Sequence, residues 1–163
     1  WIPAEAAADP LPGHRPAEVQ CPRSGWRVEP QGFEVNTQRC NYAHFSQPSL
    51  APVVPGSRVA AMVYHFNLVA AEPATAHVAF AVGERVVWEN TVAIPGKANV
   101  FNIEFTADFS APAGTPVYFH LHNHGSNEWT LASMEVQVDD PLADVAHKSR
   151  PQPGGRTRRC TAG

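Results

Sequence analysis

Apolar and polar positions alternate through the middle of the chain, and this pattern predicts a succession of β-strands. In the clearest case three apolar side chains alternate with a tyrosine and two histidines, in the run Val117-Tyr118-Phe119-His120-Leu121-His122. Successive strand side chains point to opposite sides of a sheet. We therefore expect the apolar side of this strand to face a core and the Tyr/His side to face outward.

Similar runs recur at intervals of roughly 10 to 15 residues, each bounded by Pro- or Gly-containing turns. They predict strands at 58–69, 76–82, 85–94, 99–105 and 128–138, with two short strands between Cys21 and Cys40 that are broken at 30–32. The segment 41–55 contains three prolines, which favours a loop and a sheet edge over a central strand. No stretch has a helical period. The pattern predicts an all-β fold, an antiparallel two-sheet β-sandwich or jelly roll.

The chain of 163 residues is long enough for one well-cored domain. We assign residues 21–138 to the β-sandwich domain. Residues 1–20 are rich in proline and alanine and are interpreted as an extended arm, and 139–163 as a Pro/Gly/Arg-rich tail.

Charge and hydropathy exclude two classes of partner. Fifteen acidic residues against twelve basic ones give a net charge of −3, which provides no broad basic surface for nucleic acid. No apolar run approaches the roughly 20 residues of a membrane-spanning helix. Membrane contact is therefore expected only through partners or through the basic tail, which contains Arg156, Arg158 and Arg159.

The cysteines bear on the cellular compartment. Cys21 and Cys40 flank the segment 22–39 and are placed to close a disulfide, while Cys160 in the tail would be unpaired or joined to another chain. The chain begins at Trp1 without a methionine, which a removed signal peptide would explain. We expect an exported protein, whether periplasmic, cell-surface or secreted. The alternative is a cytosolic protein with three reduced cysteines.

The order of these features resembles the galactose-binding-like jelly rolls, especially the carbohydrate-binding modules of bacterial polysaccharide hydrolases. The resemblance spans about residues 32–138 and rests on pattern: Phe33-Glu34, then 46–50 before a strand entry at 54–59, then 87–89, then a closing hairpin through 117–136. It implies a two-sheet sandwich that binds glycans on a concave sheet face or at loop tips, often with a structural calcium. The closely spaced histidines at 120, 122 and 124 have no counterpart in that pattern.

Sugar rings present C–H groups that pack on aromatic planes, while amide, imidazole and carboxylate groups read the hydroxyls. One candidate set for such binding, on the condition that the strands carrying it are neighbours, is Tyr118, His120, His122, Asn102, Glu104 and Trp129. Asn123, Asn127 and Glu128, close to Gly125, are candidates for calcium or a glycan at a loop tip. In turns, however, such residues more often satisfy the backbone geometry.

The same histidines are candidate metal ligands. His120 and His122 stand two apart on one strand face, roughly 7 Å apart at the backbone, so both rings can reach one ion. A further ligand would come from His124, His65 or His77. The competing interpretation is that these imidazoles form hydrogen bonds on a sheet face. Apart from a structural calcium or a His-bound transition metal, no cofactor is expected.

No catalytic motif is present: the chain lacks Gly-x-Ser-x-Gly, a glycine-rich phosphate loop and His-Glu-x-x-His. The leading hypothesis is a non-catalytic, exported binding module that recognises a glycan or a protein partner through the His/Tyr-bearing sheet face and adjacent loops. The second is a structural or accessory subunit of a larger extracytoplasmic or membrane-associated assembly, its arms wrapping neighbouring subunits through protein–protein interaction. The third is a His-based metal-binding protein.

Overall fold

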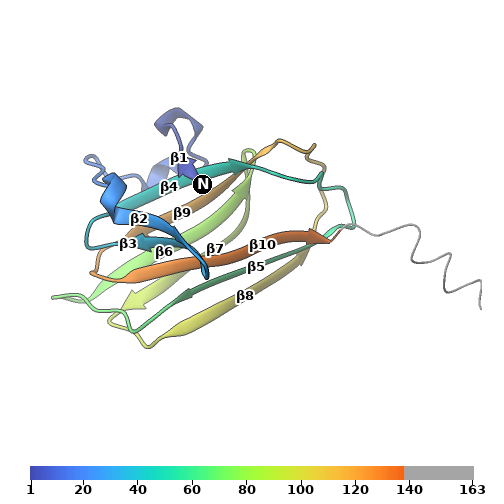
Figure 1. Cartoon of the computed structure of the whole chain (residues 1–163). Helices are drawn as coiled ribbons and strands as arrows, with labels where there is room; N and C mark the ends of the chain where they lie inside the picture. The colour runs from blue at the N-terminus through green and yellow to red at the C-terminus, as the bar shows by residue number, and fades with distance from the viewer. Residues whose placement is uncertain (138–163) are drawn as a thin grey trace, which may run out of the picture.

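The computed structural model describes residues 1–137 as two β-sheets packed face to face, with short 3-10 helices only in the N-terminal region (Figure 1). The elements, in chain order, are β1 (Ile2–Pro3), η1 (Ala6–Ala8), η2 (Pro12–His14), η3 (Arg23–Gly25), β2 (Trp26–Glu29), β3 (Gly32–Asn36), β4 (Tyr42–Pro48), β5 (Arg58–His65), β6 (Ala74–Val82), β7 (Arg85–Ile94), β8 (Asn99–Thr106), β9 (Pro116–Asn123) and β10 (Glu128–Gln137).

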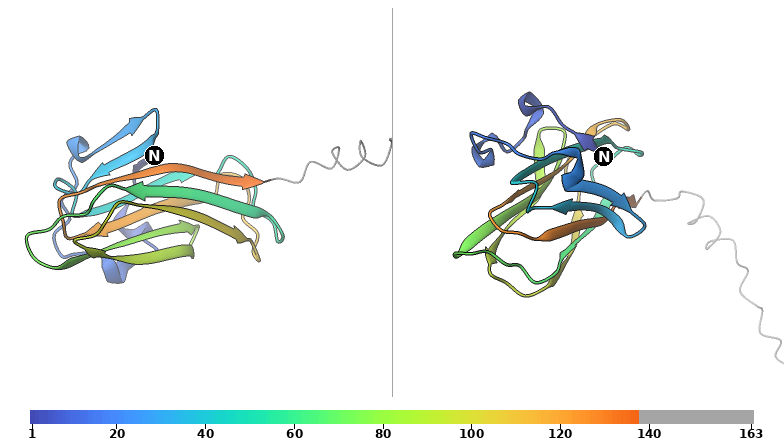
Figure 2. Two further views of the ribbon diagram at one scale, coloured as in Figure 1. Left: turned by 90° about the horizontal axis from the view of Figure 1, so that it is seen from below. Right: turned by 60° about the vertical axis from the view of Figure 1, so that its left-hand side comes forward.

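Each sheet has five strands. The first sheet has the order β1-β4-β9-β6-β7, and the second sheet has the order β2-β3-β10-β5-β8. All neighbouring strands pair antiparallel. Figure 2 shows the two layers from below and from the side. The predicted all-β, two-sheet antiparallel sandwich is confirmed.

The core lies between the sheets and is built from inward side chains at alternate positions along the strands. Val117, Phe119 and Leu121 of β9 are all buried, as their parity predicted. Phe119 packs on Phe80 of β6 with ring centroids 5.5 Å apart, and Phe33 of β3 packs across the sandwich against Phe45 of β4 at 4.9 Å. Burial of this aromatic and aliphatic surface supplies the main driving force for joining the sheets.

The expectation for the segment 41–55 was wrong, because Tyr42–Pro48 forms β4. This strand lies between β1 and β9, and its first four residues are buried. A proline is tolerated there because Pro48 ends the strand, where its missing N–H interrupts no ladder.

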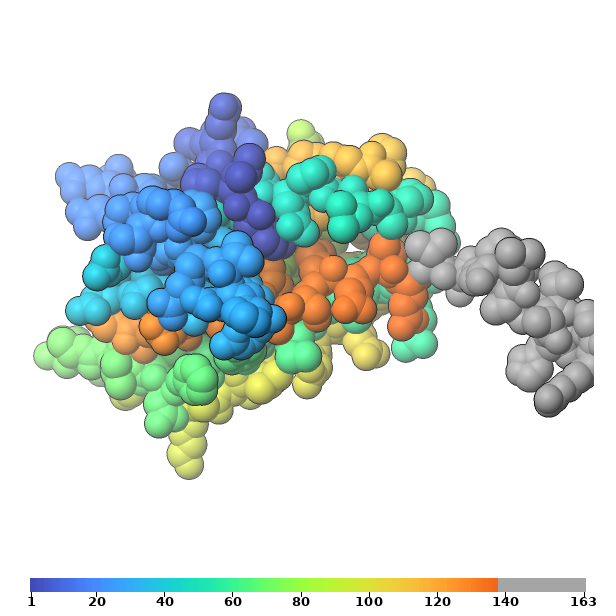
Figure 3. Space-filling view, in the orientation of Figure 1, coloured from blue at the N-terminus to red at the C-terminus, as the bar shows by residue number. Residues whose placement is uncertain are grey.

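The N-terminal arm, residues 1–20, is folded onto the first sheet rather than extended. Ile2 and Pro3 pair with Ser46 and Phe45 of β4, and η1 and η2 follow. The arm is seen as dark-blue ribbon above β4 and β9 in Figure 1, and as dark-blue atoms against the body of the molecule in Figure 3. It covers its own domain.

The predicted disulfide between Cys21 and Cys40 is present. It joins the end of the arm to the turn after β3, and Cys40 is buried. The side-chain amide of Asn41 holds the same junction, since it donates to the carbonyl of Glu18 at 2.8 Å and accepts from the amide of Gln20 at 2.8 Å. The arm is thus tied to the sandwich at both of its ends.

The predicted tail, 139–163, with Cys160 and its arginine cluster, lies outside the described residues. Within 1–137, no helix is long and apolar enough to cross a lipid bilayer.

Candidate functional site

The outward face of the first sheet carries a layer of histidines arranged by strand register. One row across the sheet reads His44 on β4, His120 on β9, Ala79 on β6 and Glu89 on β7. The adjacent row reads Tyr42, His122, His77 and Thr91. Alternation along each strand therefore gathers four imidazoles from three strands on one face. This face is the candidate site that the sequence pointed to most directly.

The N-terminal arm closes over this face through Asp9. The Asp9 side chain is completely buried. Its carboxylate accepts a hydrogen bond from the hydroxyl of Tyr42 and another, at 2.9 Å, from the backbone amide of Leu11. Arg15 completes the arrangement: its guanidinium lies 3.4 Å from Asp9 and stands over the Tyr42 ring at 5.2 Å. The carboxylate is thus paired and hydrogen-bonded, as burial of a charge requires.

A second arm residue, His14, lies on the histidines of the sheet. Its ring stacks on that of His77, with centroids 3.7 Å apart and planes 11° apart, and lies 5.6 Å from the ring of His120 at 75°. His77 and His120 are 5.1 Å apart. One ring nitrogen from each of the three residues lies within 4.8 Å of the other two. His77 Nε2 also lies 3.1 Å from Glu89 Oε2.

Enclosure under the arm favours neutral imidazoles. Burial, together with the neighbouring His77, lowers the pKa of His120 to about 3. Burial likewise lowers the pKa of His44 and of His77. For Asp9 burial opposes ionisation, but the hydrogen bonds from Tyr42 and from the backbone amide of Leu11 hold the pKa of its carboxyl below the usual value. The layer therefore presents lone pairs on neutral imidazoles beside one buried negative charge.

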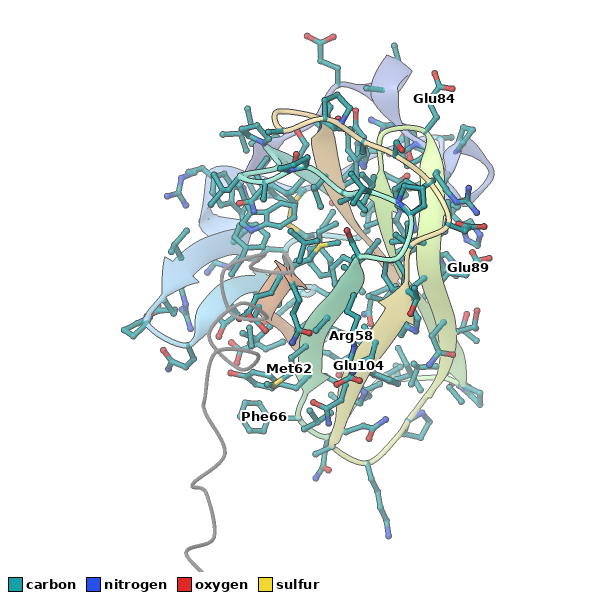
Figure 4. The ribbon with its side chains drawn as sticks, turned by 90° about the vertical axis from the view of Figure 1, so that its right-hand side faces the viewer. Arg58, Met62, Phe66, Glu84, Glu89 and Glu104 are labelled. Atoms are coloured by element: carbon teal, nitrogen blue, oxygen red, sulfur yellow. A yellow bond between two sulfur atoms is a disulfide. The ribbon has the colours of Figure 1, made fainter. Side chains whose placement is uncertain are left out.

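The second sheet presents a different surface on the opposite side of the sandwich. The outward side chains of β5 and of the residue after it are Arg58, Ala60, Met62, Tyr64 and Phe66. Met62 is 38% exposed and Phe66 is 65% exposed. Figure 4 shows Met62 and Phe66 projecting from this side, which also carries Arg58 and Glu104. This open face consists of the outward residues of β5 and β8.

A pocket of about 300 Å³ lies at the end of the open face, beside Phe66. Phe66 is its single apolar lining residue, and the others all carry polar side chains: Asn36, Gln38, Asn67, Ser126, Asn127 and Glu128. We call this the amide pocket. Sequence reasoning did not find Phe66, because the run 58–69 is apolar on both sides and was interpreted as a strand covered on both faces. Its exposure follows from continuing the outward parity of β5 by one residue.

The predicted glycan-binding set does not form one surface. Tyr118, His120 and His122 lie on the first sheet beneath the arm, whereas Asn102 and Glu104 lie on β8 in the second sheet. The condition that these strands are neighbours is not met, because the chain crosses from one sheet to the other between β8 and β9. The expectation for Trp129 was wrong as well. Its side chain is fully buried in the core, and its indole N–H donates to the Asn123 side chain at 3.3 Å.

The predicted metal ligands separate in the same way. His65 belongs to β5 and packs inward against Trp129 at 4.4 Å, so it lies apart from the layer. His122 and His124 contact each other at 4.4 Å. His77 and His120 do come together, but their partner is His14, which sequence reasoning missed because the arm has no periodicity that places it.

The loop 123–128, proposed as a calcium or glycan site, is held together by its own amides. The Asn123 side chain donates to Thr37 Oγ1 at 2.9 Å and to the carbonyl of Gly125 at 2.7 Å. The side-chain Oδ1 of Asn127 accepts from the backbone amide of Val69 at 2.6 Å. These bonds give the two asparagines a role in positioning the turn. Glu128 is exposed and lines the amide pocket.

No protein-family model matches the chain, and no curated protein matches it. Two solved structures have a similar fold. One, described as "CBM4 structure and function", has a TM-score of 0.44 and 8% sequence identity, over 69% of this chain and 87% of that chain. The other, described as "Family 16 Carbohydrate Binding Module-2", has a TM-score of 0.39 and 10% identity, over 74% of this chain and 85% of that chain. The two-sheet sandwich that the sequence resemblance implied is present in this chain.

Proposed function

We propose that this protein is a non-catalytic, exported β-sandwich module that binds a glycan on the open face of the second sheet. The observation that carries the proposal is the position of Phe66. This large aromatic side chain is 65% exposed and borders a pocket whose other lining residues all carry polar side chains. An aromatic ring so exposed gains little by packing within the monomer, so its placement beside clustered amides calls for a ligand.

The chemistry of the amide pocket matches a sugar ring. A pyranose offers one apolar face of C–H groups, which packs on an aromatic plane, and a rim of hydroxyls that both donate and accept hydrogen bonds. Asn36, Gln38 and Asn67 can do both, and Glu128 adds an acceptor. The volume of about 300 Å³ lies at the lower end of the range for small-molecule sites. Tyr64, whose ring lies 6.1 Å from that of Phe66 at 82°, extends the aromatic surface.

The open face continues from the amide pocket along β5, which gives room for a chain of sugars. Tyr64 pairs with Val100 and Met62 with Asn102, so apolar and amide side chains alternate across the two strands. At the far end a hollow of about 220 Å³ is lined by residues that include Arg58 and Glu104, whose charged groups lie 3.6 Å apart. Polar side chains therefore flank an apolar strip along the length of this face.

The outward, His/Tyr-bearing face of the first sheet is closed by the arm. Tyr118 is 8% exposed and His120 is 1% exposed, which leaves them unable to meet a polysaccharide while the arm is in place. We therefore place the glycan on the second sheet and not on the His/Tyr-bearing face of the first. The Cys21–Cys40 disulfide supports export, since such bonds persist in oxidising compartments.

The test is a glycan array followed by affinity electrophoresis with the retained polysaccharides, comparing the wild-type chain with Phe66→Ala. We expect Phe66→Ala to weaken retention at least about tenfold, which corresponds to about 1.4 kcal/mol of lost stacking. Leu50→Ala is the matched control, because Leu50 is 95% exposed in the loop after β4 and lines no part of the amide pocket. The proposal would be contradicted if the wild-type chain retained no glycan, or if Phe66→Ala retained it as well as the wild type does.

A further inference from the structure

The histidines beneath the arm form a group that glycan binding does not use. His14 comes from the last residue of η2, His77 from β6 and His120 from β9, so three separate chain segments converge. Their nearest ring nitrogens lie within 4.8 Å of one another. Convergence of three imidazoles is rarely a by-product of core packing, because each ring carries polar nitrogen atoms that need partners.

Several of these nitrogen atoms have no partner in the protein. Both ring nitrogens of His120 and Nδ1 of His77 are buried and accept or donate no hydrogen bond within the described residues. His120 is 1% exposed. A buried polar atom left without a partner destabilises the folded state, because it has given up its hydrogen bond to water. Two such residues side by side, both facing a third imidazole, indicate a missing occupant that accepts nitrogen lone pairs.

The contact between His77 and Glu89 determines which ring nitrogen of His77 carries the free lone pair. With Nε2 only 3.1 Å from Glu89 Oε2, the imidazole donates its Nε2–H to the carboxylate. Nδ1 is then the unprotonated nitrogen, and it is the buried, unpartnered one. A histidine that donates one N–H to a carboxylate while offering its other nitrogen is the usual arrangement around a protein-bound transition metal.

We propose that His14, His77 and His120 bind one divalent transition-metal ion, Zn²⁺ or Cu²⁺, which fastens the N-terminal arm to the first sheet. Three nitrogen donors favour these ions over Mg²⁺ and Ca²⁺, which prefer oxygen. Zn–N bonds of about 2.0–2.1 Å place tetrahedral nitrogens closer together than 4.8 Å. Because an imidazole lone pair lies in the plane of its ring, binding requires the ring of His14, on the arm, to turn out of its face-to-face stack on His77. Glu89 orients His77 from outside the coordination shell. This site lies on the opposite side of the sandwich from the proposed glycan face, and the inference is independent of glycan binding.

The experiment uses the full chain prepared without a histidine tag and stripped with EDTA. Isothermal titration with ZnCl₂ and with CuCl₂ is expected to give one site per chain, and MgCl₂ and CaCl₂ are expected to give none. His14→Ala should weaken binding strongly, and Glu89→Gln should weaken it by about 10- to 100-fold. Because His14 and Glu89 are only partly buried or exposed, both variants are expected to keep the fold.

His122→Gln is the matched control, since His122 lies on the same face but belongs to the pair with His124. It should bind the ion as the wild type does. A second readout is the arm itself: one equivalent of Zn²⁺ should slow hydrogen exchange at the Ala4 amide, which bonds to the His44 carbonyl at 2.9 Å, in wild type and not in His14→Ala. The proposal would be overturned if neither Zn²⁺ nor Cu²⁺ bound at one site per chain. So would binding that is lost in His122→Gln and unchanged in His14→Ala.

Discussion

The hydrogen bond from Tyr42 to Asp9 is expected to be the strongest single attachment of the arm, and Tyr42→Phe isolates it. The substitution removes one hydroxyl and keeps the ring, so the contact with the Arg15 guanidinium at 5.2 Å is retained. The carboxylate that loses its donor has no exposed surface, and water therefore cannot replace the hydroxyl. It keeps only the Leu11 amide at 2.9 Å and Arg15 at 3.4 Å.

The expected magnitude follows from the charge on the acceptor. A hydrogen bond to an ionised group contributes about 1.5–3 kcal/mol. Tyr42→Phe should therefore lower the free energy of unfolding at pH 7 by about that amount, and the melting temperature by about 3 to 12 °C for a chain of this size. Urea denaturation followed by tryptophan fluorescence measures the first quantity and calorimetry the second. If the arm opens on its own, exchange at the Ala4 amide should accelerate by about 10- to 150-fold.

The matched control is Tyr64→Phe, which removes a hydroxyl from a half-exposed ring on the second sheet. Its effect should stay within about 0.5 kcal/mol. If Tyr42→Phe were as stable as Tyr64→Phe, the reasoning that the arm is held by a buried carboxylate would be refuted. An arm that exchanged equally fast in both variants would refute it in the same way.

Two further predictions concern pH and backbone geometry. Burial lowers the pKa of His44, so the unfolded chain binds this proton more readily than the folded chain does. The contribution of His44 to the free energy of unfolding should therefore be full above about pH 6.5 and should fall below it by up to about 1.4 kcal/mol per pH unit. In denaturation measured with EDTA present, His44→Phe should reduce this slope, and a free energy of unfolding that does not change with pH would contradict the prediction. The groups that face His44 are Asp9, Arg15, Tyr118 and His120. Gly32→Ala should destabilise the fold by more than about 2 kcal/mol, since a Cβ at φ +141° would collide with the Leu131 carbonyl. Gly114→Ala, at φ +88° with nothing within 4 Å, should cost only the backbone strain, and equal melting temperatures for the two would be the contrary result.

Strand parity was enough to predict the sandwich and the inward side of β9, because alternation is a local property that survives in any sheet arrangement. Parity does not say which sheet a strand joins. β8 and β9 are consecutive strands, yet they belong to different sheets, and this separates Asn102 from Tyr118. The same limit explains the placement of His65. The alternation along its strand could be predicted from the sequence, but the sheet to which that strand belongs could not.

The arm shows a second limit. Its contacts are made by single side chains, Asp9 and His14, to partners that lie far along the chain. Such contacts leave no periodic trace, so a segment of prolines and alanines was interpreted as an extended linker. The consequence was an inverted picture of exposure: the histidine face expected to be open is closed, and the face that is open was recognised only from the position of Phe66.

The pairing of β1 with β4 has a bearing on solubility. Without Ile2 and Pro3, β4 would become the edge of the first sheet and would present unpaired backbone groups beside buried aromatic side chains. Such edges template intermolecular strand pairing. The arm covers this one with a segment of only two residues, and one of them is a proline with no N–H to offer a further strand. The N-terminal arm thus acts as a cap against edge-to-edge aggregation. A chain shortened to begin at residue 17 would keep its disulfide, lose the packing of Trp1 on Phe33 and Phe119, and be prone to assemble through β4.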